Sequence, residues 1–365
     1  MLHRSPTRVH GRHVLFLPNW RVVPARDGSK FQSPDVYPDD GRYWFFRNFK
    51  EEWSVDVLDA AWWPGWRLEE RYLHFYLTQA LPALSALSLL RRYNLVFAHG
   101  VQSVVALSAM LRIFSLRHPP MVVVDPGALN GGRPDRRLSF AATRWALAEA
   151  TSLIWHASGS AELCKTMCPE LAARGTFIPL GINDYELAGV ASRDGDYVVC
   201  PGYAQRDWST LLKAWASLPT VPLKLIGVPE TQFTSLPTGA AALPPLPFDE
   251  YRECVANARL VILPLPDGWA SWGQMTLLQA MALGKPVIVS DVRPVSDYIG
   301  PWCHAVRPDN AEELRHAVLR LWNDRALRSR LSEAAKEAVA HHFSERRMAV
   351  AFEAVMRDAV TSPSR

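Results

Sequence analysis

The sequence lacks the cysteine pattern of a secreted protein. It contains five cysteines in 365 residues, and an odd number without close pairs favours a reducing compartment over a disulfide framework. Cys164 and Cys168 have no second pair of Cys or His nearby, so we interpret them as buried thiols rather than as zinc ligands. We therefore expect a cytoplasmic protein without a metal site.

Long hydrophobic runs are also missing. The apolar run Val14–Leu17 is too short for the core of a signal peptide. The longest apolar stretch, Tyr72–Leu90, is interrupted by His74 and Pro82, whereas a membrane-spanning helix needs about 20 apolar residues. We expect a helix packed on a sheet there. Peripheral contact with the inner face of the membrane stays open as an alternative.

The chain has no strong excess of charge of one sign. Its formal net charge is +4, and no block of Lys and Arg suggests a nucleic-acid-binding face. Apolar residues make up 48% and charged residues 21%, as in ordinary globular proteins. The charge pattern therefore predicts no nucleic-acid partner. The length exceeds what a single hydrophobic core usually supports, so we expect two domains.

Short runs rich in Val, Leu, Ile and Phe alternate with helical patterns, which is typical of parallel α/β units. The first series of expected strands is His13–Leu17, Val55–Leu58, Leu95–His99, Met121–Val124, Ser152–His156 and Phe177–Pro179. The second is Tyr197–Cys200, Leu223–Ile226, Leu260–Leu263, Pro286–Val289 and His304–Val306. The polar link Gly181–Gly195 separates them. The pattern predicts two doubly wound Rossmann-like domains facing a cleft at the carboxyl ends of their strands.

The segment Pro264–Asp291 carries the clearest chemistry. It reads as a loop broken by glycine, a helix, a Gly-Lys-Pro stop and a buried strand. A loop that leads into a helix directs unpaired N–H groups and the positive end of the helix dipole at one point, where an anion binds well. Ser271, Trp272, Gly273 and Gln274 form this candidate phosphate loop.

This segment resembles the nucleotide-sugar-binding segment of glycosyltransferase family 4, which are retaining enzymes of the two-domain GT-B fold. The family usually carries Glu-x7-Glu here, and this chain has Ser271 and Gln279 at those positions. The second Glu of the family binds the ribose hydroxyls, so the resemblance implies this role for Gln279, with a solvated helix residue as the alternative. Asp267 is a candidate for the missing carboxylate.

A second loop, after the strand Tyr197–Cys200, contains Gly202, Gln205 and Arg206, and a helix is expected to begin near Asp207. Family members commonly have Gly-Arg followed by a Lys here, and both cations hold the donor diphosphate. The resemblance places Arg206 at the Lys position, while the Arg is lost or replaced by Tyr203. The alternative is that Arg206 and Asp207 only form a charged helix start.

The first half is expected to bind the acceptor. His99 ends one strand and is a candidate for contact with the acceptor or the sugar. The family often has a His after the next strand, where this chain has Asp125, so the resemblance makes Asp125 a candidate base or ligand of a sugar hydroxyl. The alternatives are a helix cap or packing role for His99 and a turn-forming role for Asp125. The loop Trp62–Trp66 suits either acceptor recognition or membrane contact.

The resemblance implies domains at 1–185 and 186–343, with a helix at 344–365 that returns to the first domain. It further implies transfer of a sugar, with retention and without a metal, from a nucleotide-diphosphate sugar to a glycan, lipid-linked or small-molecule acceptor. No cofactor is expected besides the donor, and a UDP-sugar is favoured on general frequency alone. The alternative is a catalytically degenerate GT-B protein that binds a nucleotide sugar and stabilises a partner enzyme.

Overall fold

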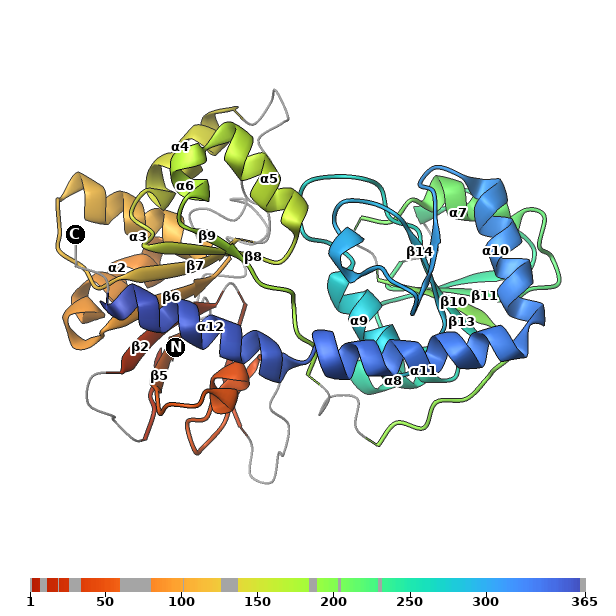
Figure 1. Ribbon diagram of the computed structural model, residues 1–365, viewed down its shortest axis with the longest axis horizontal. Helices are drawn as coiled ribbons and strands as arrows, with labels where there is room; N and C mark the ends of the chain where they lie inside the picture. Colours follow the sequence, from red (N-terminus) through yellow and green to blue (C-terminus); the bar gives the residue numbers. More distant parts are fainter. Residues whose placement is uncertain are drawn as a thin grey trace. The chain divides into compact units, whose positions relative to one another are not determined.

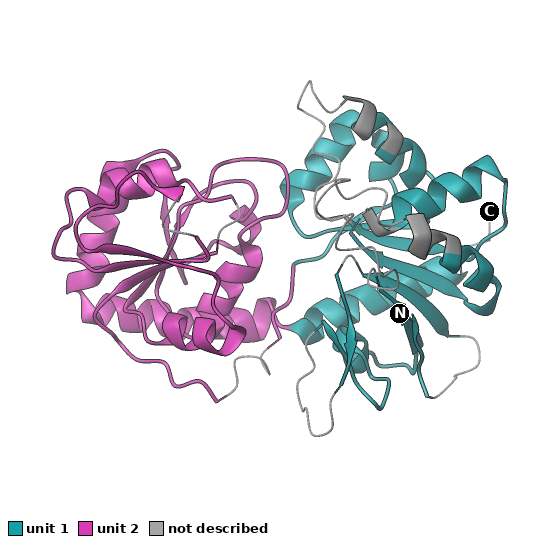
Figure 2. Ribbon diagram, turned by 180° about the vertical axis from the view of Figure 1, so that it is seen from behind, with its two compact units in different colours: residues 1–179, 345–365 teal, residues 180–344 magenta. Residues whose placement is uncertain are grey.

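The structure is a computed structural model that describes residues 2–6, 12–18, 20–25, 34–59, 80–100, 102–125, 137–183, 189–202, 205–228 and 232–361. The chain forms two compact units, Met1–Pro179 with Glu345–Arg365 and Leu180–Ser344 (Figure 2). The second unit thus begins before residue 186, where the second domain was expected to start. The backbone explains this boundary, because Ile182 N–H donates to the Phe343 carbonyl at 2.8 Å.

The first unit contains a seven-stranded sheet in the order β1-β5-β2-β6-β7-β8-β9. Its main strands are β2 (His13–Pro18), β5 (Ser54–Leu58), β6 (Leu95–His99), β7 (Met121–Asp125), β8 (Ser152–Trp155) and β9 (Gly175–Phe177). They run parallel, and only β1 (Leu2–His3) pairs antiparallel, with β5. A separate pair joins β3 (Val23–Pro24) and β4 (Val36–Tyr37). Strands β2 and β5 are fully buried; β2 has the apolar sequence that such burial favours, whereas β5 also buries Ser54 and Asp56.

Helices connect these strands (Figure 1). They are α2 (Ala80–Leu89), α3 (Gln102–Ile113), α4 (Arg137–Leu147), α5 (Ser158–Met167) and α6 (Pro169–Ala172), with short 3-10 turns η1 (Trp44–Asn48) and η3 (Leu90–Arg92). Part of the stretch Tyr72–Leu90 forms α2, and residues 71–79 lie outside the described residues, as does the loop Trp62–Trp66. The described part of the chain contains no helix with the length and apolarity needed to cross a membrane.

The second unit contains a six-stranded, fully parallel sheet in the order β12-β11-β10-β13-β14-β15. Its strands are β10 (Val198–Pro201), β11 (Leu223–Ile226), β12 (Ala240–Leu243), β13 (Leu260–Leu263), β14 (Val287–Ser290) and β15 (His304–Val306). Its helical elements are α7 (Trp208–Trp215), α8 (Phe248–Ala256), α9 (Gln274–Ala282), η7 (Ser296–Tyr298), α10 (Ala311–Asn323) and α11 (Arg325–His342).

Alternate strand residues of this sheet enter two separate apolar cores. Val199 and Val261 pack with α8 and α9, whereas Val198 and Ile262 pack with α7 and α10. Helices therefore cover both faces of the sheet, which is the doubly wound arrangement that the sequence predicted.

The last helix, α12 (Glu345–Thr361), belongs to the first unit. The carboxylate of Glu353 is buried and accepts the N–H groups of Lys50 and Glu51, both at 2.9 Å. Glu345 is also buried and pairs with Arg47 at 2.8 Å. The returning helix is thus held by two buried carboxylates that receive complementary donors.

Candidate functional site

Arg206 lies at the carboxyl edge of the second sheet. Strand β10 ends at Pro201, and Gly202 follows with φ 89°, a conformation that favours glycine. The Arg206 side chain folds back, so that its Nη2 donates to the Pro201 carbonyl at 2.7 Å and to Thr276 Oγ1 at 3.3 Å. A Cβ on residue 202 would lie 2.6 Å from Arg206 Nη2. Glycine is therefore needed here both for the turn and for the position of the guanidinium.

The start of α9 lies beside this guanidinium. Gly273 is its N-cap residue, with φ 85° and no side chain to cap the helix. A Cβ on Gly273 would lie 2.6 Å from Leu265, so this residue too is confined to glycine. Thr276, which contacts Arg206, belongs to the first turn of α9, where the N–H groups have no partner within the helix. A cation and the positive end of a helix dipole thus meet at one place, and an anion is the ligand that suits both.

Gln279 lies one turn further along α9. Its Oε1 accepts a hydrogen bond from the Tyr251 hydroxyl of α8 at 3.1 Å. Burial raises the pKa of Tyr251 to about 12, and the nearby Arg206 opposes this rise. Arg206, Tyr251 and Gln279 therefore form one cluster. Tyr251 could not be identified from the sequence, because its partner is 28 residues away and no local pattern marks the pair.

The pKa of Arg206 reflects its buried surroundings. Burial lowers its pKa from the usual value for a guanidinium, while the nearby Cys200 and Tyr251 favour the charged form. Both neighbours are themselves neutral acids, because burial also raises the pKa of the Cys200 thiol to about 12. The side chain of the neighbouring Asp207 caps α7, where it accepts a hydrogen bond from the Thr210 N–H at 3.0 Å. The expected helix start near Asp207 is thus confirmed, and Arg206 is separate from that cap.

The other predicted residues of this loop have different surroundings. The Gln274 side chain is buried and donates to the Pro294 carbonyl, and the Trp272 indole donates to the Pro266 carbonyl at 3.3 Å. Both side chains thus stabilise the loop. Any phosphate contact of these two residues must therefore come from their backbone N–H groups. Ser271 Oγ is buried without a hydrogen-bond partner among the described residues. Gln205 is exposed, with φ 52°.

Asp267 is not free to replace the missing carboxylate. Its two oxygens contact Arg293 Nε at 3.1 and 3.0 Å, and the Arg293 N–H donates to the same carboxylate. This pairing lowers the pKa of Asp267. The Asp267 carboxylate is therefore engaged by Arg293, and its role as the missing acid stays a prediction.

The predicted residues of the first unit lie at the carboxyl edge of its own sheet. His99 ends β6 and Asp125 ends the adjacent β7; the side chain of Asp125 is outside the described part. His99 lies against Trp20 and Trp44, with ring centroids 5.0 and 5.6 Å apart, and its Nδ1 has no hydrogen-bond partner among the described residues. Two sets of residues result: the neighbouring strand ends with His99 and Asp125 in the first unit, and Arg206 and Gln279 with Tyr251 and the start of α9 in the second.

A second histidine, which the sequence analysis missed, lies near His99. His156 follows β8, its ring centroid is 6.1 Å from that of His99, and its Nδ1 is 2.8 Å from the Ile178 carbonyl oxygen. Burial lowers the pKa of His99 to about 3, with a further contribution from His156, and burial lowers the pKa of His156 to about 4. Both rings are therefore neutral near pH 7.

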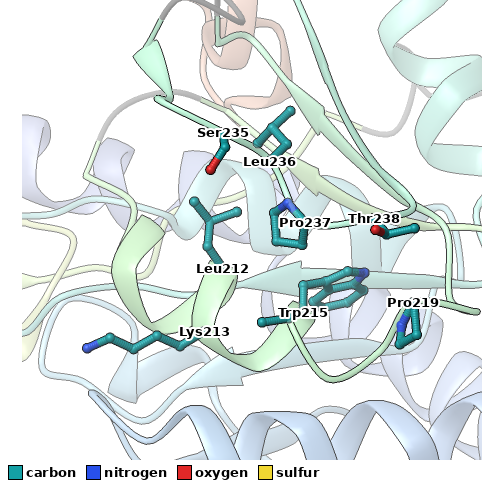
Figure 3. Close-up of a pocket in the computed structure, with 9 residues that line it drawn as sticks. Leu212, Lys213, Trp215, Pro219, Ser235, Leu236, Pro237 and Thr238 are labelled. Atoms are coloured by element: carbon teal, nitrogen blue, oxygen red, sulfur yellow. The ribbon is translucent and has the colours of Figure 1, made fainter.

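Other features of the described residues do not add to these two sets. No group of three or more His, Cys, Asp and Glu side chains forms a metal-binding arrangement in the described ranges. A hollow of about 560 Å³ lies between α7 and the segment before β12. Leu212, Trp215 and Pro237 are among the residues that line it (Figure 3). None of the predicted site residues lines it.

Comparison with known proteins identifies related folds. Residues 210–338 match the family described as glycosyl transferases group 1. No curated protein matches the chain. Sucrose-phosphate synthase from Thermosynechococcus elongatus is similar in structure, with a TM-score of 0.67 and 15% identity over 95% of this chain and 98% of that chain.

Two further solved structures contain nucleotides. HepE from Anabaena, in complex with UDP-glucose, has a TM-score of 0.65 and 15% identity over 95% of this chain and 99% of that chain. The catalytic domain of starch synthase IV from Arabidopsis thaliana, bound to ADP and acarbose, has a TM-score of 0.59 and 14% identity over 86% of this chain and 83% of that chain. The likeness confirms the GT-B fold, and together with the group 1 match it supports a GT-B glycosyltransferase.

Proposed function

We propose that this protein transfers a sugar from a nucleotide-diphosphate sugar to a glycan, lipid-linked or small-molecule acceptor. The observation that carries the proposal is the convergence of Arg206 and the first turn of α9 at the carboxyl edge of the second sheet. The match of residues 210–338 to the group 1 glycosyl transferases supports it. The UDP-glucose of HepE and the ADP of starch synthase IV are ligands of those proteins, and they suggest a nucleoside diphosphate here.

In this proposal, the diphosphate binds between the Arg206 guanidinium and the backbone N–H groups of Gly273, Gln274 and Met275. Arginine forms paired, charge-assisted hydrogen bonds with phosphate oxygens, and the helix start adds backbone donors. Gln279 binds the ribose. Because Tyr251 donates to its Oε1, the NH₂ group of Gln279 remains as a donor to a ribose oxygen.

We further propose that the transfer retains the anomeric configuration and needs no metal. The leaving diphosphate oxygen accepts the proton of the acceptor hydroxyl on the face that is attacked, so the protein only stabilises the diphosphate charge and orients both substrates. Proton NMR of the first-formed product, which distinguishes its anomers, tests retention. Turnover in excess EDTA tests the independence from metal.

Release of the nucleoside diphosphate from a panel of UDP-, ADP- and GDP-sugars tests the activity itself. We expect release with at least one donor, and its loss in Arg206→Ala. Arg330→Ala is the matched control, since Arg330 is an exposed arginine on α11. If no donor is turned over or bound, the proposal fails.

A degenerate binding protein is the second candidate function. Its specific support is that Ser271 and Gln279 replace the usual acids while Asp267 is paired with Arg293. A protein that binds a nucleotide sugar through Arg206 without any turnover or hydrolysis would favour this alternative.

A further inference from the structure

The first unit exposes a group of large apolar side chains at one edge of its sheet. Ile113 is 66% exposed, Phe114 65% and Leu116 44%, all at the end of α3 and in the loop that follows. Trp145 on the adjacent α4 is 41% exposed, and the Arg112 guanidinium lies 4.8 Å from its ring centroid. Isolated exposed apolar residues are common, but here three lie within four positions, next to an arginine that covers an exposed tryptophan. We call these residues the apolar patch.

Exposed cations surround this patch. Arg91 and Arg92 lie in η3, at the end of α2, which packs beside α3, and Arg117 follows the apolar loop. The chain enters β6, β7 and β8 from these three helix ends, so all of them lie at the amino edge of the sheet (Figure 1). The candidate residues His99 and Asp125 end their strands at the opposite edge.

Two acids close to α3 and α4 are paired with cations. Glu149 lies 3.4 Å from Arg112 and 3.2 Å from His118 Nε2, and Glu170 lies 2.7 Å from Arg144. Arg91, Arg92 and Arg117 therefore give the described part of this edge an excess of positive charge. Cations at helix C-termini also complement the helix dipole, which accounts for the arginines but not for the exposure of Ile113 and Phe114.

We propose that this edge, defined by Arg91, Arg92, Ile113, Phe114, Leu116, Arg117 and Trp145, binds the surface of a membrane that contains anionic phospholipids. The arginines contact the lipid phosphates, and the apolar side chains enter the boundary between head groups and acyl chains. Tryptophan and phenylalanine suit this interface, because their rings bury apolar area near a polar layer. The proposal is independent of the nucleotide-sugar site and concerns a surface other than the loop Trp62–Trp66.

Sedimentation with vesicles tests the proposal. The full-length protein is mixed with vesicles of phosphatidylcholine alone, or with about 30% phosphatidylglycerol, at low and high salt. We expect binding only to the anionic vesicles, and weaker binding in high salt because the charges are screened. Arg91→Gln with Arg117→Gln should weaken binding roughly fivefold for each arginine lost. Phe114→Ser should weaken it about tenfold or more, because a large apolar side chain is no longer buried.

Matched substitutions in other parts of the chain serve as controls. Val350→Ser removes an exposed apolar side chain from α12, and Arg325→Gln with Arg330→Gln removes two exposed cations from α11. Neither should change binding. Unchanged melting temperatures would show that the surface variants are folded. The proposal is overturned if anionic vesicles are not bound, if Phe114→Ser binds them as well as the wild type, or if this edge instead forms a dimer that Phe114→Ser dissociates.

Discussion

The buried histidines His99 and His156 should make the stability of the first unit depend on pH. Both rings are neutral in the folded protein, since the pKa of His99 is lowered to about 3 and that of His156 to about 4. In the unfolded chain each histidine titrates near pH 6.5. Between these values the unfolded state binds more protons than the folded state, so stability is fully present above about pH 6.5 and decreases as the pH falls.

The size of this effect follows from the shifts. pH 5 lies about 1.5 units below the pKa of a histidine in the unfolded chain. Protonation of each histidine therefore stabilises the unfolded state by about 2 kcal/mol at this pH. The folded pKa values of both histidines lie below pH 5, so each contributes a similar amount. We expect the free energy of unfolding of this unit to fall by roughly 4 kcal/mol between pH 7 and pH 5 because of this pair.

Urea unfolding at several pH values, followed by tryptophan fluorescence, measures the effect. His99→Asn and His156→Asn should each remove about half of the decrease between pH 7 and pH 5. His316→Asn should leave the decrease of the first unit unchanged, since His316 lies on α10 in the second unit. Nitrogen-edited NMR of the histidine rings gives the two pKa values directly. A value near 6.5 for either ring, or a decrease that survives in both variants, would refute the reasoning.

Two substitutions test other contacts. Tyr251→Phe should raise the dissociation constant of the donor about threefold to tenfold, because Gln279 loses a hydrogen bond that typically contributes about 1 kcal/mol; unchanged donor binding would separate Tyr251 from the site. Glu353→Gln should lower the free energy of unfolding by roughly 1–3 kcal/mol, because its buried carboxylate accepts two backbone N–H groups. The control Glu333→Gln changes an exposed acid on α11. A decrease in its free energy of unfolding as large as that of Glu353→Gln would contradict this account.

The sequence predicted the fold because buried parallel strands are continuous apolar runs. Strands β6, β11, β13 and β15 have the expected bounds. The edge strand β12 was missed, since its sequence Ala240–Leu243 contains three alanines, which have low β propensity and gain their conformation by pairing with β11. Strand positions could therefore be predicted where the local sequence is strongly apolar. They could not be predicted where only pairing with a neighbouring strand determines the conformation.

The candidate site was predictable only in part. Arg206, Gly202 and Gly273 were identifiable, because glycines and a cation before a helix are local signals. The partners of these residues come from distant elements: Thr276 meets Arg206, Tyr251 meets Gln279, and Arg293 pairs with Asp267. No spacing rule connects such pairs, so the partner of Gln279 and the pairing of Asp267 with Arg293 emerged only from the structure.

The central claim is that Arg206 and the start of α9 bind a nucleoside diphosphate, and calorimetric titration with UDP tests it most directly, with ADP and GDP in parallel. We predict saturable binding of at least one of them to the wild type. In Arg206→Ala the affinity should fall about tenfold to a hundredfold, because a hydrogen bond from a charged group contributes about 1.5–3 kcal/mol. Arg330→Ala should bind as the wild type does. Equal affinity in Arg206→Ala, or no binding of any of the three nucleotides, would contradict the account.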